Sequence, residues 1–470
     1  MMPMNLDKYR DRLKAADLMA CHGTVVRVTG LTVESKGPPV GVGQLCEIGM
    51  AGGRRALAEV VGFNHELRVL LPLENIDGIA PNSPVWARTA PRSLSIGPNV
   101  LGRVMDGLGR PIDGKGPIDG PDACPLDNTS PPPMSRRPIR EPLSFGLRVF
   151  DGILTCGKGQ RMGIFSGSGV GKSTLLGEIA RSSSADVNVL ALVGERGREV
   201  RHFIEESLGP EGLARSVVVV ATSDTPAIQR VKATFTAIAI AEYFRNRGKD
   251  VLFMMDSVTR LAQAQREIGL AAGEPPTTKG YCPSVYAMMP KITERLGSGA
   301  IGSITGIITI LVEGDDMNDP VADTMRSLLD GHIVLSRKLA EMGHYPAVDI
   351  LQSVSRLMTA VTPREHQLAA QRFRAIYATY QGAEDLINIG AFSPGHNRRI
   401  DTAVTLIDRV NEFLIQPCGT RTAFPETVAR LTEITQAWSF LVPQEEDALP
   451  AAPLRRVFDG AAAGAAGGAT

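Results

Sequence analysis

A loop of small residues between two apolar segments constrains the fold of this chain more than any other feature. Residues 163–180 read GIFSGSGVGKSTLLGEIA, so an apolar run enters a loop with Gly167, Gly169 and Gly171 and continues with leucines at helical spacing. Such a loop turns successive backbone N–H groups toward phosphate oxygens, and it needs a buried strand before it and a helix after it. The stretch therefore predicts a strand–loop–helix unit that binds the phosphates of a nucleotide.

Side chains at the end of the loop are predicted to complete this site. Lys172 would neutralise oxygens of the β- and γ-phosphates, and the Ser173 hydroxyl would bind Mg²⁺. The loop departs from the pattern G-x-x-x-x-G-K-[ST] at Ser166, which is small enough to replace the first glycine where the backbone avoids positive φ. The predicted nucleotide contacts in the loop are Gly167, Ser168, Gly169, Val170, Gly171, Lys172, Ser173 and Thr174.

Apolar strands alternate with helical segments along the middle of the chain. The segment AIQRVKATFTAIAIAEYFRNRG (227–248), which lies between two of the strands, has the periodicity of a helix. Buried strands that alternate with helices indicate a mostly parallel sheet covered by helices on both faces. The predicted strands are RMGIFS (161–166), VNVLALVGER (187–196), SVVVVATS (216–223), DVLFMMD (250–256) and ITGIITILVEG (304–314).

Different patterns flank this region and indicate separate domains. Between residues 23 and 88, short strands such as TVVRVTGLTVE (24–34), ALAEVVGF (56–63) and LRVLLPL (67–73) predict a small β-barrel. From about Glu365 the strands stop, and helical periods predict a helical domain. The segments GRVMDGLGRPIDGKGP (102–117) and NTSPPPMSRRPIREP (128–142) are rich in Gly and Pro and are interpreted as loop or linker.

The two ends of the chain carry simpler patterns. Residues 5–19 place apolar side chains at helical spacing with charges on the other faces, which predicts an amphipathic helix that either packs on the body or docks to a partner helix. The final GAAAGAAGGAT (460–470) has little to bury, and we expect it to be a disordered tail.

Composition argues against several classes of protein. Fifty Lys and Arg balance fifty Asp and Glu, so the net charge gives no attraction to nucleic acid or anionic lipid. The six cysteines form no C-x-x-C pair, which argues against a metal knuckle or a disulfide framework. No apolar run has the length that a bilayer needs, and the N-terminus is charged where a signal peptide would be apolar. We expect a cytoplasmic protein without a nucleic-acid partner.

Two carboxylates follow predicted strands and are candidates for hydrolysis chemistry, which needs one group to support the metal and one to polarise water. Asp256 ends DVLFMMD and is either the metal-directing aspartate or the cap of the next helix. Glu195 follows VNVLALVG and is either the water-polarising base or part of a solvated charged rim.

The order of the motifs resembles that in the catalytic subunits of rotary ATP synthases. The phosphate loop is followed by GERGREV (194–200), DSVTRLAQAQREIGLAAGEPPTTKGYCPSVY (256–286) and YPAVDILQSVSR (345–356). The residues of these motifs are most similar to those of the ATPases that drive flagellar and injectisome type III protein export, with dense identity from about residue 102 to 356. The resemblance implies a multidomain α/β fold: an N-terminal small β-barrel, a central RecA-like P-loop ATPase domain with a mostly parallel sheet, and a C-terminal helical domain.

This resemblance sets the expected domain boundaries. They are residues 1–20 for the partner-docking helix, 21–92 for the barrel, 93–364 for the ATPase domain, 365–445 for the helical domain and 446–470 for the tail.

The resemblance also implies catalytic roles. Glu195 matches the glutamate that polarises the attacking water, Arg196 the arginine beside it, and Asp256 the aspartate that supports Mg²⁺. Arg260 matches an arginine near the phosphates, and Arg356 resembles the arginine finger that reaches into a neighbouring chain's site. An intersubunit cation is physically sensible because charge builds on the γ-phosphate in the transition state.

Aromatic positions are expected to hold the adenine of ATP. Tyr345 matches a ring that stacks on the base, and Phe424 either stacks as well or packs in the core. Cys418 stands where synthase catalytic subunits have a further aromatic residue, so a base contact there is open. Asp315 and Asp316, in LVEGDDMNDP, form either a solvated acidic turn or a loop lining the pore of a ring.

The function expected from the resemblance is an ATPase of a type III export apparatus, which releases chaperones and unfolds export substrates. ATP and Mg²⁺ are the ligands. The expected partners are five further copies in a homohexamer, a regulatory stator at the N-terminal helix, a central coiled-coil stalk, export chaperones and substrates, and the membrane export gate. The protein is then cytoplasmic and peripherally attached to the inner-membrane apparatus.

Alternatives within the superfamily are less well supported. A rotary ATP synthase subunit would carry an acidic DELSEED-like stretch in its C-terminal region, and this sequence has none there. An RNA-translocating hexamer would show basic and aromatic surfaces, to which the balanced charge and the 5% aromatic residues give little support. SGSGVGKS and GHYPA favour the flagellar over the injectisome branch. Ser166 agrees with an export ATPase, since that branch commonly has a small non-glycine residue where synthase catalytic subunits keep glycine.

Overall fold

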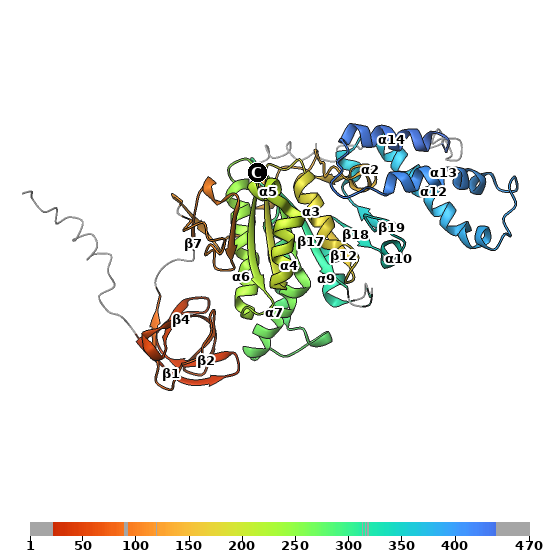
Figure 1. The fold of residues 1–470 in the computed structure, drawn as a ribbon. Coiled ribbons are helices and arrows are strands. Elements are labelled where there is room, and N and C mark those ends of the chain that lie inside the picture. Colours follow the sequence, from red (N-terminus) through yellow and green to blue (C-terminus); the bar gives the residue numbers. More distant parts are fainter. Residues whose placement is uncertain are drawn as a thin grey trace, which may run out of the picture.

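The computed structural model describes residues 22–88, 93–118, 120–312, 314, 316 and 319–438. The predicted N-terminal helix, the predicted tail, Glu313 and Asp315 lie outside the described residues. A barrel, a helix-covered sheet and a group of helices follow one another along the described chain (Figure 1). The predicted fold class is confirmed.

The N-terminal body is a closed barrel in the strand order β1-β2-β5-β4-β3-β6. Apolar side chains such as Val33, Ile48 and Leu70 fill its interior. The stretch 24–34, predicted as one strand, is a hairpin that turns at Gly30, where φ is +56°. The strands are β1 (His22–Thr29), β2 (Thr32–Lys36), β3 (Leu45–Gly49), β4 (Arg55–Asn64), β5 (Leu67–Pro72) and β6 (Pro84–Ala87), with the short helix η1 (Ala51–Gly53) before β4.

The central body is built on a sheet in the order β19-β18-β12-β17-β15-β13-β14-β8. Neighbours along this path are parallel except β18 and β19, and β16 pairs antiparallel with β17. The strands are β8 (Arg103–Asp106), β12 (Arg161–Ser166), β13 (Val187–Glu195), β14 (Ser216–Thr222), β15 (Asp250–Asp256), β16 (Gly297–Ser298), β17 (Ser303–Leu311), β18 (Gly331–Leu335) and β19 (Val348–Ser355). Two small ribbons pair β7 (Ser93–Ile96) with β9 (Asp122–Pro125), and β10 (Pro142–Leu143) with β11 (Cys156–Gly157).

Helices cover both faces of the sheet, which explains the uninterrupted apolar strands. On β13, Val189 and Ala191 face one core while Leu190 and Leu192 face the other. The first core is covered by α6 (Ala227–Arg245), α7 (Val258–Ala271), α8 (Pro283–Arg295) and α9 (Pro320–Leu328). The second is covered by α3 (Lys172–Ser182), α4 (Gly197–His202), the π-helix η4 (Phe203–Leu208) and α5 (Gly209–Ala214). Shorter helices are η2 (Pro98–Val100), η3 (Pro133–Ser135), α2 (Arg148–Ile153), η5 (Thr278–Gly280), α10 (Arg337–Glu341) and α11 (Met358–Val361).

One segment interpreted as loop belongs to the sheet. Strand β8 lies inside the Gly- and Pro-rich stretch 102–117 and forms the edge beside β14. Arg103 on this strand is bidentate to Asp113, with Nε to Oδ2 at 2.7 Å and Nη2 to Oδ1 at 3.0 Å. The loop interpretation is therefore wrong for residues 103–106, because a side-chain ion pair folds the stretch back on itself.

The C-terminal body consists of helices, as predicted. Helix α12 (Arg364–Asn388) packs against α13 (Arg398–Leu414) and α14 (Phe424–Gln436), and the rings of Phe373 and Phe413 lie 5.1 Å apart between them. Their core is continuous with the face of the sheet that carries α3.

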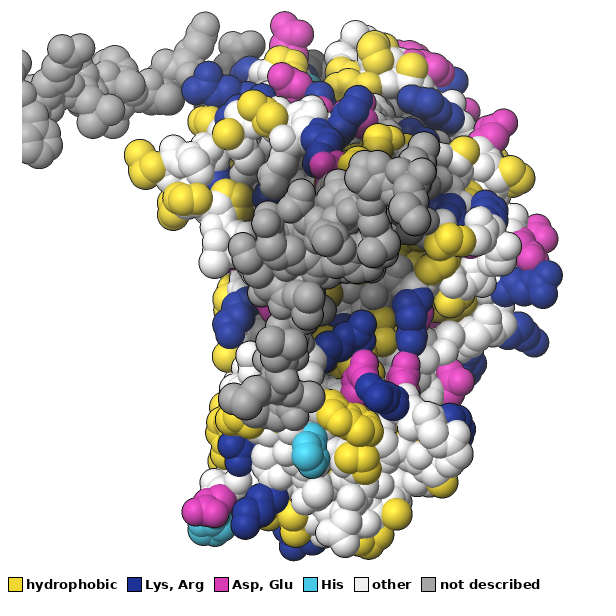
Figure 2. Space-filling model, turned by 90° about the vertical axis from the view of Figure 1, so that its left-hand side faces the viewer, with side chains coloured by type: hydrophobic (Ala, Val, Ile, Leu, Met, Phe, Trp, Pro, Cys, Tyr) yellow, Lys and Arg dark blue, Asp and Glu magenta, His cyan; other side chains and the backbone are white. Residues whose placement is uncertain are grey.

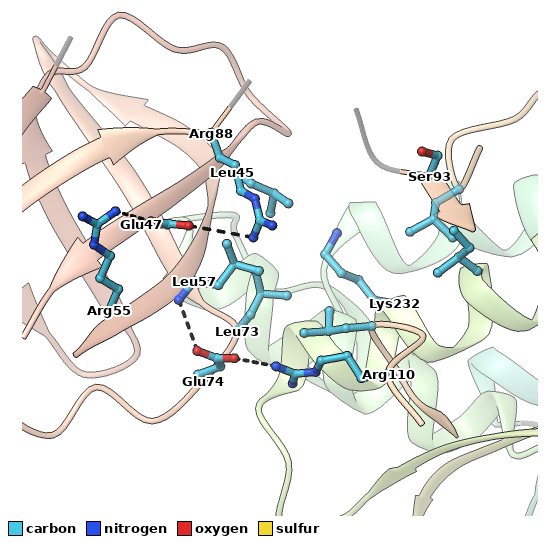
Figure 3. A pocket seen from close by; sticks show the side chains of 13 residues that line it. Leu45, Glu47, Arg55, Leu57, Leu73, Glu74, Arg88, Ser93, Arg110 and Lys232 are labelled. Carbon is cyan, nitrogen blue, oxygen red and sulfur yellow. Dashed lines mark hydrogen bonds and ion pairs between the residues drawn. The ribbon is translucent and has the colours of Figure 1, made fainter. Parts of the chain in front are cut away.

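The barrel contacts the central body through an interface that contains a hydrogen bond and an apolar contact. Gln229 Nε2 donates to the carbonyl of Leu73 at 2.6 Å, and Ile228 packs against Leu73. A cavity of about 370 Å³ lies along this interface, and Figure 3 shows Glu74 reaching from the barrel to Arg110, at 2.7 Å.

The described surface mixes charges of both signs. On the face shown in Figure 2, Lys and Arg side chains stand among Asp and Glu and scattered hydrophobic side chains. Among the described helices, none combines the length and apolar character needed to cross a bilayer.

Candidate active site

The phosphate loop joins β12 to α3, as the sequence predicts. Gly169 and Gly171 have φ of +81° and +85°, a left-handed conformation that side chains rarely adopt, so both positions favour glycine. Helix α3 begins at Lys172. Its first turn therefore offers free backbone N–H groups and the positive end of the helix dipole to the loop.

Ser166 fits the loop without strain. It is the last residue of β12, so its backbone is extended and leaves room for a side chain where the phosphate-loop pattern has glycine. Its side chain is buried, and among the described residues its hydroxyl has no hydrogen-bond partner.

Three charged side chains meet behind the loop. Lys172 Nζ lies 2.5 Å from Asp256 Oδ1 and 3.8 Å from Glu195 Oε1. Thr309 Oγ1 donates to the same Asp256 oxygen at 2.7 Å. Glu195 ends β13 and Asp256 ends the adjacent β15, so the carboxyl ends of parallel strands bring the two acids to one edge of the sheet.

Glu195 has the electrostatic environment of a general base. Burial and the negative charge of Asp256 raise the pKa of Glu195 to about 7, against the opposing effect of Lys172. A base is most effective when its pKa lies near the working pH. This environment agrees with the predicted role of Glu195 as the water-polarising base.

The loop, Lys172 and Glu195 open onto a cavity of about 740 Å³. Arg196 and Arg260 line it: Arg196 pairs with Glu199 at 3.0 Å, and Arg260 donates to Gln263 at 3.1 Å. Asp256, which pairs with Lys172, is not among the lining residues. The other predicted site residues on the cavity are Gly167, Ser168, Gly169, Gly171, Lys172, Ser173, Thr174 and Glu195.

Comparison with known proteins agrees with this geometry. Residues 146–355 match the nucleotide-binding domain of the ATP synthase alpha/beta family, and residues 362–433 match the T3SS EscN ATPase C-terminal domain. The flagellum-specific ATP synthase of Bacillus subtilis is 52% identical over 427 residues, covering 90% of this chain and 98% of the relative. The type 3 secretion system ATPase of Xanthomonas euvesicatoria is 48% identical over 415 residues, covering 88% and 94%.

A solved structure is similar over the same range. The assembled ATPase EscN of the enteropathogenic E. coli type III secretion system superposes with a TM-score of 0.84 at 42% identity, covering 88% of this chain and all of that one. The chain belongs to the export ATPases of flagella and type III secretion systems. As a member of this family it is an ATP hydrolase, in accord with the phosphate loop and the two carboxylates.

The export ATPase has a second, smaller pocket next to the phosphate cavity. Val170, Tyr345 and Cys418 line it, so the cysteine lies at the same pocket as the tyrosine predicted to contact the base. Phe424 does not line it: its ring packs edge-on against His366, with centroids 5.9 Å apart, which favours core packing over stacking on a base.

Arg356 lies outside the phosphate cavity of its own chain. It follows β19, is exposed, and its Nη2 donates to the carbonyl of Arg326 at 3.2 Å. The structure thus brings the other predicted catalytic residues of the export ATPase together and leaves this arginine on the surface.

Some residues of the site were not predicted from the sequence. Ser223 follows β14, Arg337 begins α10, and both line the phosphate cavity. Ser223 ends a predicted strand, the kind of signal that identified Glu195, whereas no predicted strand precedes Arg337.

Proposed function

We propose that this export ATPase hydrolyses Mg²⁺-ATP at sites shared between neighbouring chains of a homohexamer and powers flagellar type III export. The position of Arg356 carries the proposal. Lys172, Glu195 and Asp256 converge within one chain, whereas Arg356 is exposed away from them, as an arginine that completes a neighbour's site must be.

The residues around the phosphate loop fit Mg²⁺. Ser173 brings a hydroxyl to the cavity, and Asp256 brings a buried carboxylate to the same edge; both are the hard oxygen groups that Mg²⁺ prefers. When bound, the ion neutralises phosphate charge. Ser173 would hold it directly and Asp256 would hold its water shell.

The chain's own side chains perform the remaining steps. The loop N–H groups and Lys172 hold the phosphates, with Arg260 close to them. Glu195 orients a water molecule and takes its proton, with Arg196 beside it, while Arg356 of the neighbouring chain stabilises the negative charge that builds on the γ-phosphate. Tyr345 holds the base.

The partners follow from the family. A relative, EscN, forms an assembled ATPase and a complex with its central stalk EscO, and this chain superposes on one chain of that complex with a TM-score of 0.82 at 42% identity. We propose the same hexamer and stalk here. Asp316 lies in the loop after β17 and pairs with Lys279 at 3.5 Å. We propose that Asp316 and its neighbour in the sequence, Asp315, contact the stalk or the substrate.

The remaining partners rest on the sequence. We propose a regulatory stator at residues 1–20, chaperones and substrates as cargo, and peripheral attachment of a cytoplasmic ring to the membrane export gate. Release of chaperones and unfolding of substrates would use the energy of hydrolysis.

A chromosomal Glu195→Gln replacement in the source organism tests the proposal. We expect the cells to lose swimming while virulence-type secretion, where present, continues. Loss of secretion with normal swimming would assign the chain to the injectisome branch, to which it is almost as similar. Retention of both would contradict an export function.

A further inference from the structure

The small pocket beside the phosphate cavity is nearly all apolar. It lies where α3, the residues after Tyr345 and the turn at Cys418 meet, and Gly171 and Thr174 line both this pocket and the phosphate cavity. The two hollows therefore adjoin at the start of α3. A nucleotide with its phosphates in the loop extends its base toward this pocket.

Glu178 and Gln416 are the two buried polar residues in this lining. Glu178 is 5% exposed, and its Oε1 accepts hydrogen bonds from the backbone N–H of Gly419, at 3.1 Å, and from Arg181. Its Oε2 is buried and has no hydrogen-bond partner, the only such side-chain atom among the described residues that line the pocket. Gln416, the other buried polar residue there, is fully engaged with Arg148, Gly146 and Thr420.

A buried acceptor without a donor costs free energy unless a ligand supplies the donor. Glu178 follows Lys172 on the same helix by six residues, which is about 9 Å along the axis. A nucleotide whose phosphates lie at Lys172 is long enough for the far edge of its base to reach Glu178.

We propose that Glu178 Oε2 accepts a hydrogen bond from the 6-amino group of adenine and so selects ATP against 6-oxopurine nucleotides. At position 6 adenine carries an amino donor, whereas guanine and hypoxanthine carry an oxo acceptor there and have their donor at N1, one ring position away; a carboxylate placed at position 6 therefore faces an acceptor in a 6-oxopurine. The inference rests on the proposed function, since it requires ATP to occupy the phosphate cavity with its base beside Tyr345.

Inosine triphosphate gives the sharpest test, because hypoxanthine carries an oxo group where adenine has its amino group. Displacement of a ribose-labelled fluorescent ADP by ATP and by ITP, with Mg²⁺ and the full chain, measures both affinities. We expect the wild-type chain to bind ATP at least about 10-fold more tightly, the effect of one hydrogen bond to a charged group. Equal affinities would overturn the role of Glu178 alone, whereas failure of labelled ADP to bind would overturn the proposed function as well.

Glu178→Gln tests the residue itself. Gly419 and Arg181 both donate to Oε1, so the amide oxygen must face them and the amide NH₂ takes the place of Oε2. A donor then faces the base, and the ratio of ITP to ATP dissociation constants should fall about 10-fold or more, to near or below one. This ratio does not depend on the fraction of folded protein.

Glu205→Gln is the matched control, because Glu205 lies on η4 and pairs only at the surface with Arg201, at 2.8 Å. Its ratio should equal that of the wild type. An unchanged ratio in Glu178→Gln, or a parallel loss of both affinities, would overturn the proposal.

Discussion

Nζ of Lys172 lies 2.5 Å from Oδ1 of Asp256, so the phosphate-loop lysine is paired with the acid that is to support the metal. Both side chains are nearly buried, at 12% and 7% exposed. Incoming phosphates compete with this carboxylate for the lysine, while Mg²⁺ would replace the lysine as the positive charge near Asp256. The pair thus offsets the charge of a carboxylate that is nearly buried.

Replacing Lys172 with Met should remove both the cation that binds the phosphates and the partner that neutralises Asp256. We expect nucleotide affinity to fall by about 100-fold or more, because a cation at the phosphates is lost. The free energy of unfolding should fall by about 3–5 kcal/mol, because Asp256 is left buried without its partner. Nucleotide titration and denaturant unfolding measure the two effects.

Lys158→Met is the control, since Lys158 pairs with Glu141 and Asp250 at 2.9 Å but is 30% exposed and precedes β12, whose opposite end leads into the loop. It should leave nucleotide affinity unchanged and cost less stability. Equal effects of the two substitutions would contradict a specific role for Lys172.

The pKa of Glu195 predicts the pH dependence of hydrolysis. Burial and Asp256 raise this pKa to about 7, and a base acts in its deprotonated form. kcat/KM, which reports on the free enzyme, should therefore rise with pH and level off above about 7. Glu195→Gln should retain nucleotide binding and lose about 10²- to 10⁴-fold in kcat. A profile that is flat between about pH 6 and pH 8 would exclude this carboxylate as the base.

Asp113 should govern part of the acid stability. Hydrogen bonds from Arg103, and from the backbone of Val104 and Lys115, hold the pKa of Asp113 well below its usual range. The native state thus favours the charged form, so this stabilisation is present above about pH 4, the unfolded pKa, and is lost as pH falls further. Asp113→Asn should lower the free energy of unfolding by about 1.5–3 kcal/mol near neutral pH.

Thermal unfolding of Asp113→Asn at neutral and acid pH measures this effect, and its difference from the wild type should shrink as the pH falls. Asp77→Asn, an exposed position in the barrel, should change neither curve. A difference that stays constant down to about pH 2 would show that Asp113 acts by packing alone.

The central sheet was predictable because its strands are buried on both faces. Five predicted strands correspond to β12, β13, β14, β15 and β17, whose side chains alternate between two apolar cores and therefore form continuous apolar runs. The phosphate loop was predictable because its glycines have a steric cause, seen in the positive φ of Gly169 and Gly171.

Features fixed by tertiary contacts were not predictable in the same way. Strand β8 is short and follows a glycine, and the Arg103–Asp113 pair that secures it spans ten residues of turn. The burial of Glu178 could not be predicted from the sequence, because a carboxylate on a helix usually faces solvent. The orientation of Phe424 toward His366 likewise depends on how α14 packs against α12.

The central claim is that neighbouring chains share each site, and mixing two inactive variants tests it most directly. Arg356→Ala keeps its own Glu195, and Glu195→Gln can supply Arg356 to a neighbour. In randomly mixed rings of equal amounts, about a quarter of the sites regain both residues, so about a quarter of the wild-type hydrolysis should return. Differently labelled chains would verify that the rings mix. Full activity of Arg356→Ala alone, or no recovery in mixed rings, would contradict the account.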